Sequence, residues 1–216
     1  MVVNEIFGSI DGEGIRAGEL ASFVRLAGCN LRCSYCDTQY ALDKNAGTEM
    51  SVNEIIDELD KIGIKNVTLT GGEPLQHKDI DILIDELLKS NYKVNIETNG
   101  SINIEKYVGK CLITMDYKCP SSNMENTINL ANIEKLGEED VLKFVVEESD
   151  LKTVEEVLRK FKIKSFVYIS PIYQKIELPK IVEFMKKCNS NGIDMTKVRM
   201  QIQLHKVIWD PEMRGV

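Results

Sequence analysis

Seven short runs of apolar, often β-branched residues recur along the chain and predict buried β-strands. Most of them are nearly continuous apolar stretches of strand length, which is typical of a sheet that is covered on both faces. The predicted strands are residues 22–27, 66–70, 93–97, 112–116, 141–146, 165–170 and 198–204.

Longer amphipathic runs separate these strands and predict helices. Residues 51–59 begin with Ser51 and Glu54 at the spacing of a capping box. In residues 79–90 the apolar side chains recur three and four positions apart, as on one face of a helix. The same character marks the runs 151–161 and 180–188, the second with Pro179 in its first turn.

The alternation of strands and helices predicts an α/β fold with mostly parallel strands joined by crossover helices. Six or seven such strands fit either a doubly wound sheet or a partial α/β barrel. A chain of 216 residues lies close to the usual size of one domain, and no segment has the composition of a linker. We therefore expect residues 1–216 to form a single domain.

Small polar groups follow most of the predicted strands. Parallel strands present their carboxyl ends at one edge of a sheet, where α/β proteins bind their ligands. Polar groups that gather at successive strand ends therefore predict one shared site. These groups are residues 28–38, 71–74, 98–100, 117–122 and 170–171, together with His205.

Composition and charge narrow the range of partners. The chain is 43% hydrophobic and 28% charged, as in ordinary soluble proteins. A net charge of −7 argues against a basic surface for nucleic acid or for an anionic membrane. The first residues do not resemble a signal peptide, and no apolar run reaches the roughly 18 residues of a membrane span. We expect a cytoplasmic protein, in which six cysteines favour metal or redox chemistry over disulfides.

Three of the cysteines, Cys29, Cys33 and Cys36, lie within eight residues in the pattern C-x3-C-x2-C. Thiolates are soft ligands that favour iron–sulfur clusters, zinc or copper(I). A structural zinc site uses four ligands, and neither His77 nor His205 has zinc-finger spacing to the three cysteines. Three cysteines on a [4Fe–4S] cluster would leave one iron open to a small molecule. Three buried apolar cysteines are the alternative, but polar residues separate them.

The C-x3-C-x2-C motif, with Tyr35 before its last cysteine, resembles the radical S-adenosylmethionine (SAM) superfamily. The GGEP sequence at 71–74 matches a second motif of that superfamily. The resemblance implies a partial (β/α)6, TIM-like barrel with mostly parallel strands. It also implies a [4Fe–4S] cluster whose open iron is chelated by SAM. One-electron cleavage of SAM would then give a 5′-deoxyadenosyl radical that abstracts hydrogen from a substrate carbon.

Four longer stretches are similar to the 7-carboxy-7-deazaguanine synthase family, namely residues 5–14, 22–38, 117–122 and 203–209. This resemblance implies conversion of 6-carboxy-5,6,7,8-tetrahydropterin to 7-carboxy-7-deazaguanine with loss of ammonia, in the biosynthesis of queuosine or archaeosine. Hydrogen would be abstracted at C6, the ring would contract, and SAM would be regenerated. Mg²⁺, a homodimer and an external one-electron reductant of the flavodoxin or ferredoxin type are implied as well.

The positions of the motifs imply which residues serve each ligand. Cys29, Cys33 and Cys36 would hold the cluster, and Thr38 would bind Mg²⁺, a hard cation that prefers oxygen. The implied SAM contacts are Tyr35, Asp37, Gly71, Gly72, Glu73, Thr98, Asn99, Lys118 and Ser121. The implied substrate contacts are Ile10, Asp11, Gly12, Glu13, Arg25, Thr70, Gln203 and His205.

Several of these residues also have simpler structural interpretations. Thr38 is equally suited to a turn or a helix cap. Asp11 stands where most members of the family carry Gln, and an ionised Asp only accepts hydrogen bonds, so its contact with the pterin is open. Arg25, inside an apolar strand, is either a carboxylate clamp or a solvated residue. A lone histidine such as His205 is usually structural, although its place at the end of the last predicted strand favours the site.

Two other functions fit part of the pattern. A radical SAM activase of a glycyl radical enzyme would share the cysteine motif, but residues 10–14 and Thr38 favour the pterin enzyme. A non-enzymatic electron carrier or zinc module would leave GGEP without a role. Cys111 and Cys188 show no metal spacing and are expected in the core or on helix faces, Cys119 in the 117–122 loop, and residues 147–150 in a solvated loop.

Overall fold

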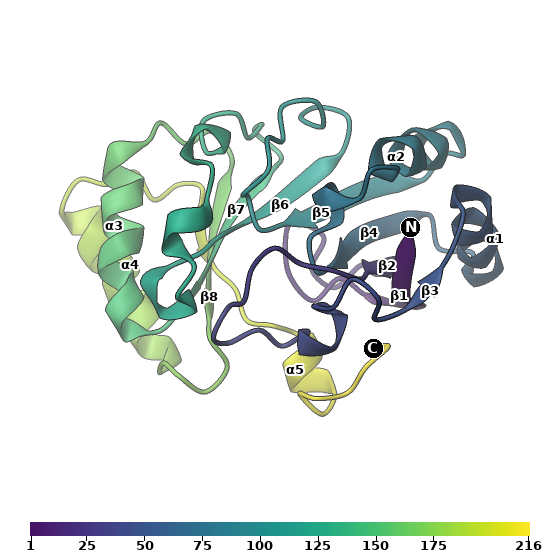
Figure 1. Cartoon of the computed structure of the whole chain (residues 1–216). Helices are drawn as coiled ribbons and strands as arrows, with labels where there is room; N and C mark the ends of the chain where they lie inside the picture. Colours follow the sequence, from purple (N-terminus) through teal and green to yellow (C-terminus); the bar gives the residue numbers. More distant parts are fainter.

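One nine-stranded sheet runs through the computed structural model, which describes all 216 residues (Figure 1). The strand order is β3-β1-β2-β4-β5-β6-β7-β8-β9. All pairs from β2 to β9 are parallel, whereas β1 pairs antiparallel with β2 and β3. The strands are β1 (Val2–Ile10), β2 (Leu20–Leu26), β3 (Thr48–Glu49), β4 (Asn66–Gly71), β5 (Lys93–Thr98), β6 (Leu112–Tyr117), β7 (Val141–Val146), β8 (Phe166–Pro171) and β9 (Val198–Met200).

Four helices lie in the crossovers between parallel strands, where the amphipathic runs predict them. The α-helices are α1 (Val52–Ile62), α2 (Ile80–Lys89), α3 (Leu151–Lys160), α4 (Leu178–Ser190) and the short α5 (His205–Ile208). The crossovers from β5 to β6 and from β6 to β7 contain no α-helix. Short 3₁₀ helices occur at Gln39–Ala41, Pro74–Gln76, Pro120–Ser122, Glu125–Thr127, Leu130–Asn132 and Glu148–Asp150. In Figure 1, α1 and α2 flank one half of the sheet and α3 and α4 flank the other.

Local sequence explains the boundaries of α1. The Ser51 hydroxyl accepts a hydrogen bond from the Glu54 backbone N–H, and the Glu54 carboxylate accepts one from the Ser51 backbone N–H. This is the predicted capping box. The helix ends where Gly63 adopts a left-handed conformation with φ 77°, which glycine adopts without steric cost.

The prediction of an α/β fold with a mostly parallel sheet is confirmed, and the sheet is open because β3 and β9 are not paired with each other. The strand predicted at 198–204 is too long, since β9 ends at Met200. The following segment leaves the sheet because the Leu204 N–H bonds to the Gly12 carbonyl at 3.2 Å. His205 consequently begins α5 rather than ending a strand. Strand β1 also lies outside the seven predicted strands.

The two faces of the parallel strands differ in polarity. Side chains such as Leu69, Ile96 and Ile113 belong to a cluster of 36 buried residues that forms the hydrophobic core. Their neighbours along β4 to β7 point to the other face, because side chains alternate in a strand. That other face carries Thr68, Thr70, Asn95, Glu97, Thr114, Asp116 and Lys143. The parallel strands therefore place their apolar side chains in the hydrophobic core and their polar side chains on the opposite face, here called the inner face of the sheet.

No helix has the length and apolar character needed to cross a membrane.

Candidate functional site

Two neighbouring cavities lie at the carboxyl ends of the parallel strands. The first, here called the cysteine cavity, contains most of the predicted ligand-binding residues. It is lined among others by Glu13, Cys29, Cys33, Tyr35, Cys36, Asp37, Thr38, Thr70, Gly71, Gly72, Thr98, Asn99, Lys118 and Gln203. The second, here called the tail cavity, is bounded by residues 211–216 and lined by Ile10, Gly12, Arg25 and His205 as well. Glu13, Asp37, Thr38, Glu97 and Lys206 line both, so the two cavities adjoin.

The three cysteines project from the loop after β2. The Leu31 N–H lies 3.4 Å from the Cys29 sulfur, and the Asn99 side-chain amide lies 3.9 Å from it. Burial raises the pKa of the Cys33 and Cys36 thiols, so a bound metal would have to displace their protons. No three Cys, His, Asp or Glu side chains converge on a single metal ion. Three separate thiols on one cavity wall fit a polynuclear cluster, in which each sulfur binds a different iron.

The GGEP segment packs directly against the cysteine loop. The Gly72 N–H donates to the Leu26 carbonyl at 2.9 Å, and the Glu73 N–H donates to the Gly28 carbonyl at 2.8 Å. A Cβ atom on Gly72 would overlap the Gly28 carbonyl oxygen. Glycine at this position therefore permits the close approach of two backbone segments, the function for which a missing side chain is required.

Glu73 lies beneath the cavity rather than on its wall. Its fully buried carboxylate accepts hydrogen bonds from the Thr98 hydroxyl at 2.8 Å, the Asn99 N–H at 2.7 Å and the Leu75 N–H at 3.0 Å. Burial raises the pKa of this carboxyl group, although the three hydrogen bonds oppose the shift. Glu73 thus fixes Thr98, the last residue of β5, and Asn99 in the turn that follows.

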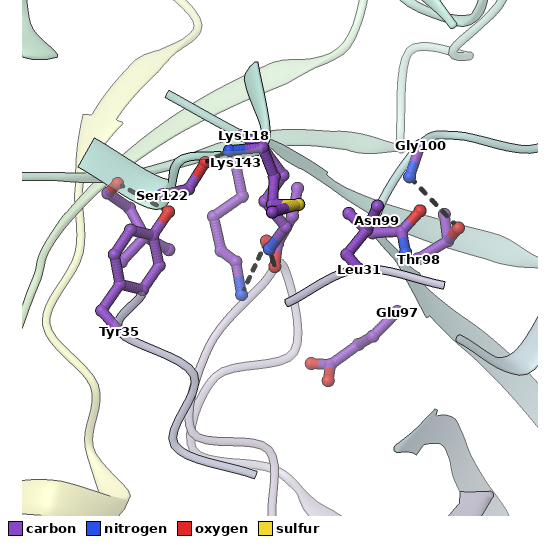
Figure 2. Close-up of polar contacts among 12 residues, drawn as sticks. Leu31, Tyr35, Glu97, Thr98, Asn99, Gly100, Lys118, Ser122 and Lys143 are labelled. Carbon is purple, nitrogen blue, oxygen red and sulfur yellow. Dashed lines mark hydrogen bonds and ion pairs between the residues drawn. The ribbon is translucent and has the colours of Figure 1, made fainter. Parts of the chain in front are cut away.

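A chain of opposite charges crosses the inner face of the sheet. Lys118 lies 2.9 Å from one oxygen of Asp116, and Lys143 lies 3.0 Å from the other. Lys143 also contacts Glu13 at 3.2 Å. Burial raises the pKa of Asp116, but the two ammonium groups outweigh it and bring the pKa to about 2. Figure 2 shows Lys118 and Lys143 between Tyr35 on one side and Glu97 and Asn99 on the other.

Glu13 and Glu97 present carboxyl groups to both cavities. Glu13 Oε2 is held by Lys143 and by the Gln203 amide at 3.4 Å, whereas Glu13 Oε1 is buried without a hydrogen-bond partner. Glu97 accepts a hydrogen bond from the Thr70 hydroxyl at 2.7 Å. Burial raises the pKa of Glu97, with Lys143 and Thr70 opposing the shift. The site therefore contains one carboxylate paired with a lysine and one carboxyl group that holds a proton more readily.

Thr38 and Asp37 lie where the two cavities meet. The Thr38 hydroxyl donates to Asp37 Oδ1 at 3.0 Å, and Lys206 contacts Asp37 Oδ2 at 3.2 Å. His205 packs against Gly12, where an added Cβ would lie 2.6 Å from the His205 Nδ1 atom. Burial lowers the pKa of His205, so the neutral imidazole is favoured at this wall.

Besides Glu73, two predicted contacts do not reach either cavity. Asp11 is 2% exposed, and its carboxylate contacts Arg16 at 3.0 Å and the Thr68 hydroxyl at 2.8 Å. Ser121 donates from its N–H and its hydroxyl to Asp150, at 3.0 Å and 2.5 Å. Both side chains are engaged within the protein, so they act on the site only by positioning other residues.

Arg25 lines the tail cavity but is paired within the chain. Its Nε lies 2.7 Å from Glu5 Oε1, and the Tyr40 hydroxyl donates to the same oxygen at 3.1 Å. Arg25 is therefore neither a solvated surface residue nor a carboxylate clamp without a partner, the two interpretations that the sequence left open.

Several site residues were absent from the predicted set. Lys143 is the single charged residue within the run 141–146, and Glu97 and Asp116 are the last residues of the runs 93–97 and 112–116. A charge inside an apolar strand or at its carboxyl end is the feature by which they could have been found. The expectation of a solvated loop at 147–150 is wrong for Asp150, which is fully buried against Ser121. Cys111 and Cys188 lie in the core as expected, and Cys119 lies there too.

Comparisons with known proteins agree with this geometry. Residues 24–111 match the family model of the radical SAM superfamily. The chain is 45% identical to the 7-carboxy-7-deazaguanine synthase of Clostridium acetobutylicum, over 99% of this chain and 98% of that protein. It is 39% identical to the protein of that name from Methanospirillum hungatei, over 98% and 86%. The crystal structure of QueE from Escherichia coli superposes with a TM-score of 0.70 over 94% of both chains, at 22% identity.

Proposed function

Because the chain belongs to the 7-carboxy-7-deazaguanine synthase family of radical SAM enzymes, we propose that it converts 6-carboxy-5,6,7,8-tetrahydropterin to 7-carboxy-7-deazaguanine with loss of ammonia. One observation carries this proposal. Cys29, Cys33, Cys36, the first two glycines of GGEP and Glu13 all line one cavity. The first four features serve a radical SAM centre, and the last provides an acceptor for a ligand rich in N–H donors.

The family implies a [4Fe–4S] cluster and SAM, and the residues of the cysteine cavity suit both. Cys29, Cys33 and Cys36 would hold the cluster through three irons. Cluster and SAM together supply the one-electron chemistry that begins hydrogen abstraction. Backbone groups of Gly71 and Gly72 would approach SAM without obstruction by a Cβ atom. The other SAM contacts that we propose are Tyr35, Asp37, Thr98, Asn99 and Lys118.

Polar groups around both cavities would orient the pterin. Glu13 Oε1 is free to accept an N–H from the ligand, while Lys143 and Gln203 fix Oε2. The neutral form of His205 can accept a hydrogen bond as well as donate one. Glu97, which Thr70 holds in place, is suited to store or release a proton near the reacting ring. Ile10, Gly12 and Arg25 would complete the wall of this site.

Finer features of the proposal follow from the resemblance and from the donor set. Thr38 lines both cavities, and its hydroxyl would bind Mg²⁺, which takes few ligands from a protein and the rest from substrate and water. An external flavodoxin- or ferredoxin-like protein would supply the electron. We further propose a single domain, a homodimer and a cytoplasmic location.

Turnover by anaerobically reconstituted protein tests the function. With SAM, Mg²⁺ and a one-electron reductant, the protein should release 7-carboxy-7-deazaguanine and ammonia from the carboxytetrahydropterin, detected by mass spectrometry. A Cys33→Ala variant should bind less iron and make no product. Protein that contains full iron and sulfide but forms no product would refute the proposal, and zinc without iron would replace it with a structural metal module.

A further inference from the structure

Nearly all lysine and arginine side chains on the two cavities already have a carboxylate partner within the chain. Lys118 and Lys143 contact Asp116 at 2.9 and 3.0 Å. The others that are paired are Lys206, 3.2 Å from Asp37, and Arg25, 2.7 Å from Glu5. Arg214 of the tail cavity is the exception, because it makes neither a salt bridge nor a side-chain hydrogen bond.

Stacking holds Arg214 in place without using its hydrogen-bond donors. Its Cζ atom lies 3.7 Å from the centre of the Tyr40 ring. Contact through the flat face of a guanidinium leaves its five N–H groups free in the plane. The Tyr40 ring is itself fixed, because its hydroxyl donates to Glu5 at 3.1 Å. The tail cavity is therefore bordered by one exposed cation that is stacked on a fixed ring and has all of its donors available.

We propose that Arg214 binds the carboxylate of the ligand in the tail cavity and thereby selects a carboxylated pterin. The inference rests on the proposed function for the identity of that ligand. A planar guanidinium matches a carboxylate through two parallel hydrogen bonds, which adds specificity to charge. The charge of Arg25 is already balanced by Glu5, which accepts from its Nε, so Arg25 holds Glu5 and, through it, Tyr40.

The carboxyl groups of the tail cavity are compatible with an anion at Arg214. Glu212, which also lines it, is exposed to solvent, where water screens its charge. Glu13 and Asp37 are paired with Lys143 and Lys206, so their negative charge is largely balanced. Glu97 accepts a hydrogen bond from the Thr70 hydroxyl, and burial favours its neutral form. Thr38 lines the same cavity, so a carboxylate could contact both the proposed Mg²⁺ and Arg214.

The test compares Arg214→Gln with a matched control. Arg199 also stacks on an aromatic ring, with its Cζ atom 4.3 Å from the centre of Phe166, but it lies outside both cavities. Loss of a charge-assisted pair should raise the KM of Arg214→Gln for carboxytetrahydropterin by about tenfold or more. Arg199→Gln should keep the wild-type KM. Arg214→Lys, which keeps the charge but loses the fork, should fall between them.

Binding titrations with two pterins separate this inference from the function on which it rests. Wild-type protein loaded with SAM should prefer the 6-carboxylated pterin to one without the carboxylate, and Arg214→Gln should lose that preference. An unchanged preference, or an equal loss of affinity for both pterins, would overturn the role of Arg214. If wild-type protein binds but does not convert the carboxylated pterin, the proposed function fails, and the titration still decides the role of Arg214.

Discussion

Asp11 and Glu13 are two residues apart, yet their carboxylates serve different purposes. Glu13 faces the cavities, whereas Asp11 is sealed against Arg16, whose guanidinium also donates to the carbonyls of Lys93 at 3.1 Å and Val67 at 3.3 Å. This buried network anchors the segment on one side of Glu13. We therefore assign Asp11 a positioning role instead of the pterin contact.

Removing one partner of this buried pair should destabilise the protein strongly. We expect Asp11→Ala to lower the free energy of unfolding by about 3 kcal/mol, because Arg16 would remain buried without its counter-ion. Urea unfolding of the metal-free protein measures this. The exposed pair Lys61–Glu58 is the control, since Lys61→Ala should leave the free energy of unfolding almost unchanged. A loss as small as that of the control would contradict the anchoring role.

The pairing of Asp116 with two lysines predicts a pH dependence of stability. Its folded pKa of about 2 is below the ordinary value of 3.8, so the pair stabilises the folded state above the unfolded pKa. That stabilisation is lost as the pH falls through the folded value. The stability difference between wild type and Asp116→Asn should thus be constant near neutrality and shrink between about pH 4 and pH 2. A difference that does not change in acid would exclude the ion pair as its source.

The cysteine site could be predicted from the sequence because its ligands are close together in the chain. Glu97, Asp116 and Lys143 could not be assigned to it in the same way. Their partners come from other strands or from the N-terminal segment, and pairing across strands depends on register, which residue type alone does not determine.

At the scale of elements, the turn after β4 and the loop after β2 act as one unit. Backbone hydrogen bonds join the turn to Leu26 at the end of β2 and to Gly28 in the loop, and the missing side chain at Gly72 allows this approach. Helix α1 and its neighbours could be predicted well because capping and amphipathic spacing are local. The extent of β9 could not, since the bond from Leu204 to Gly12 that draws this segment away is a long-range contact.

A side chain at position 72 should separate this turn from the cysteine loop. Gly72→Ala is expected to abolish SAM binding, measured by equilibrium binding to reconstituted protein, because its Cβ would overlap the Gly28 carbonyl. Gly63→Ala provides the control. It also replaces a glycine, in the left-handed conformation at the end of α1, but no atom lies within 4 Å of the added Cβ. This control should lose about 1 kcal/mol of stability and keep SAM binding. Equal SAM affinity in both variants would disprove the close approach as a requirement.

At the scale of the molecule, opposite ends of the chain complete the site. Gly14 exchanges two hydrogen bonds with the Gln201 side chain, at 2.7 and 3.0 Å, and the Leu204 N–H bonds to Gly12. Figure 1 shows α5 and the final segment beside the N-terminal strands. A partial barrel leaves one side without strands, and these terminal segments cover it. The family resemblance assigned residues of both segments to the substrate site, but their direct hydrogen bonds could not be predicted, because nothing in either segment specifies so distant a partner.

The fate of the hydrogen at C6 of the substrate tests the function most directly. We would supply carboxytetrahydropterin deuterated at C6 to the reconstituted protein and analyse both SAM and product by mass spectrometry. We expect 7-carboxy-7-deazaguanine to form while deuterium enters the recovered SAM, since the reaction removes hydrogen from C6 and regenerates SAM. Product formation with unlabelled SAM, or SAM consumption without the deazaguanine, would contradict the proposed ring contraction.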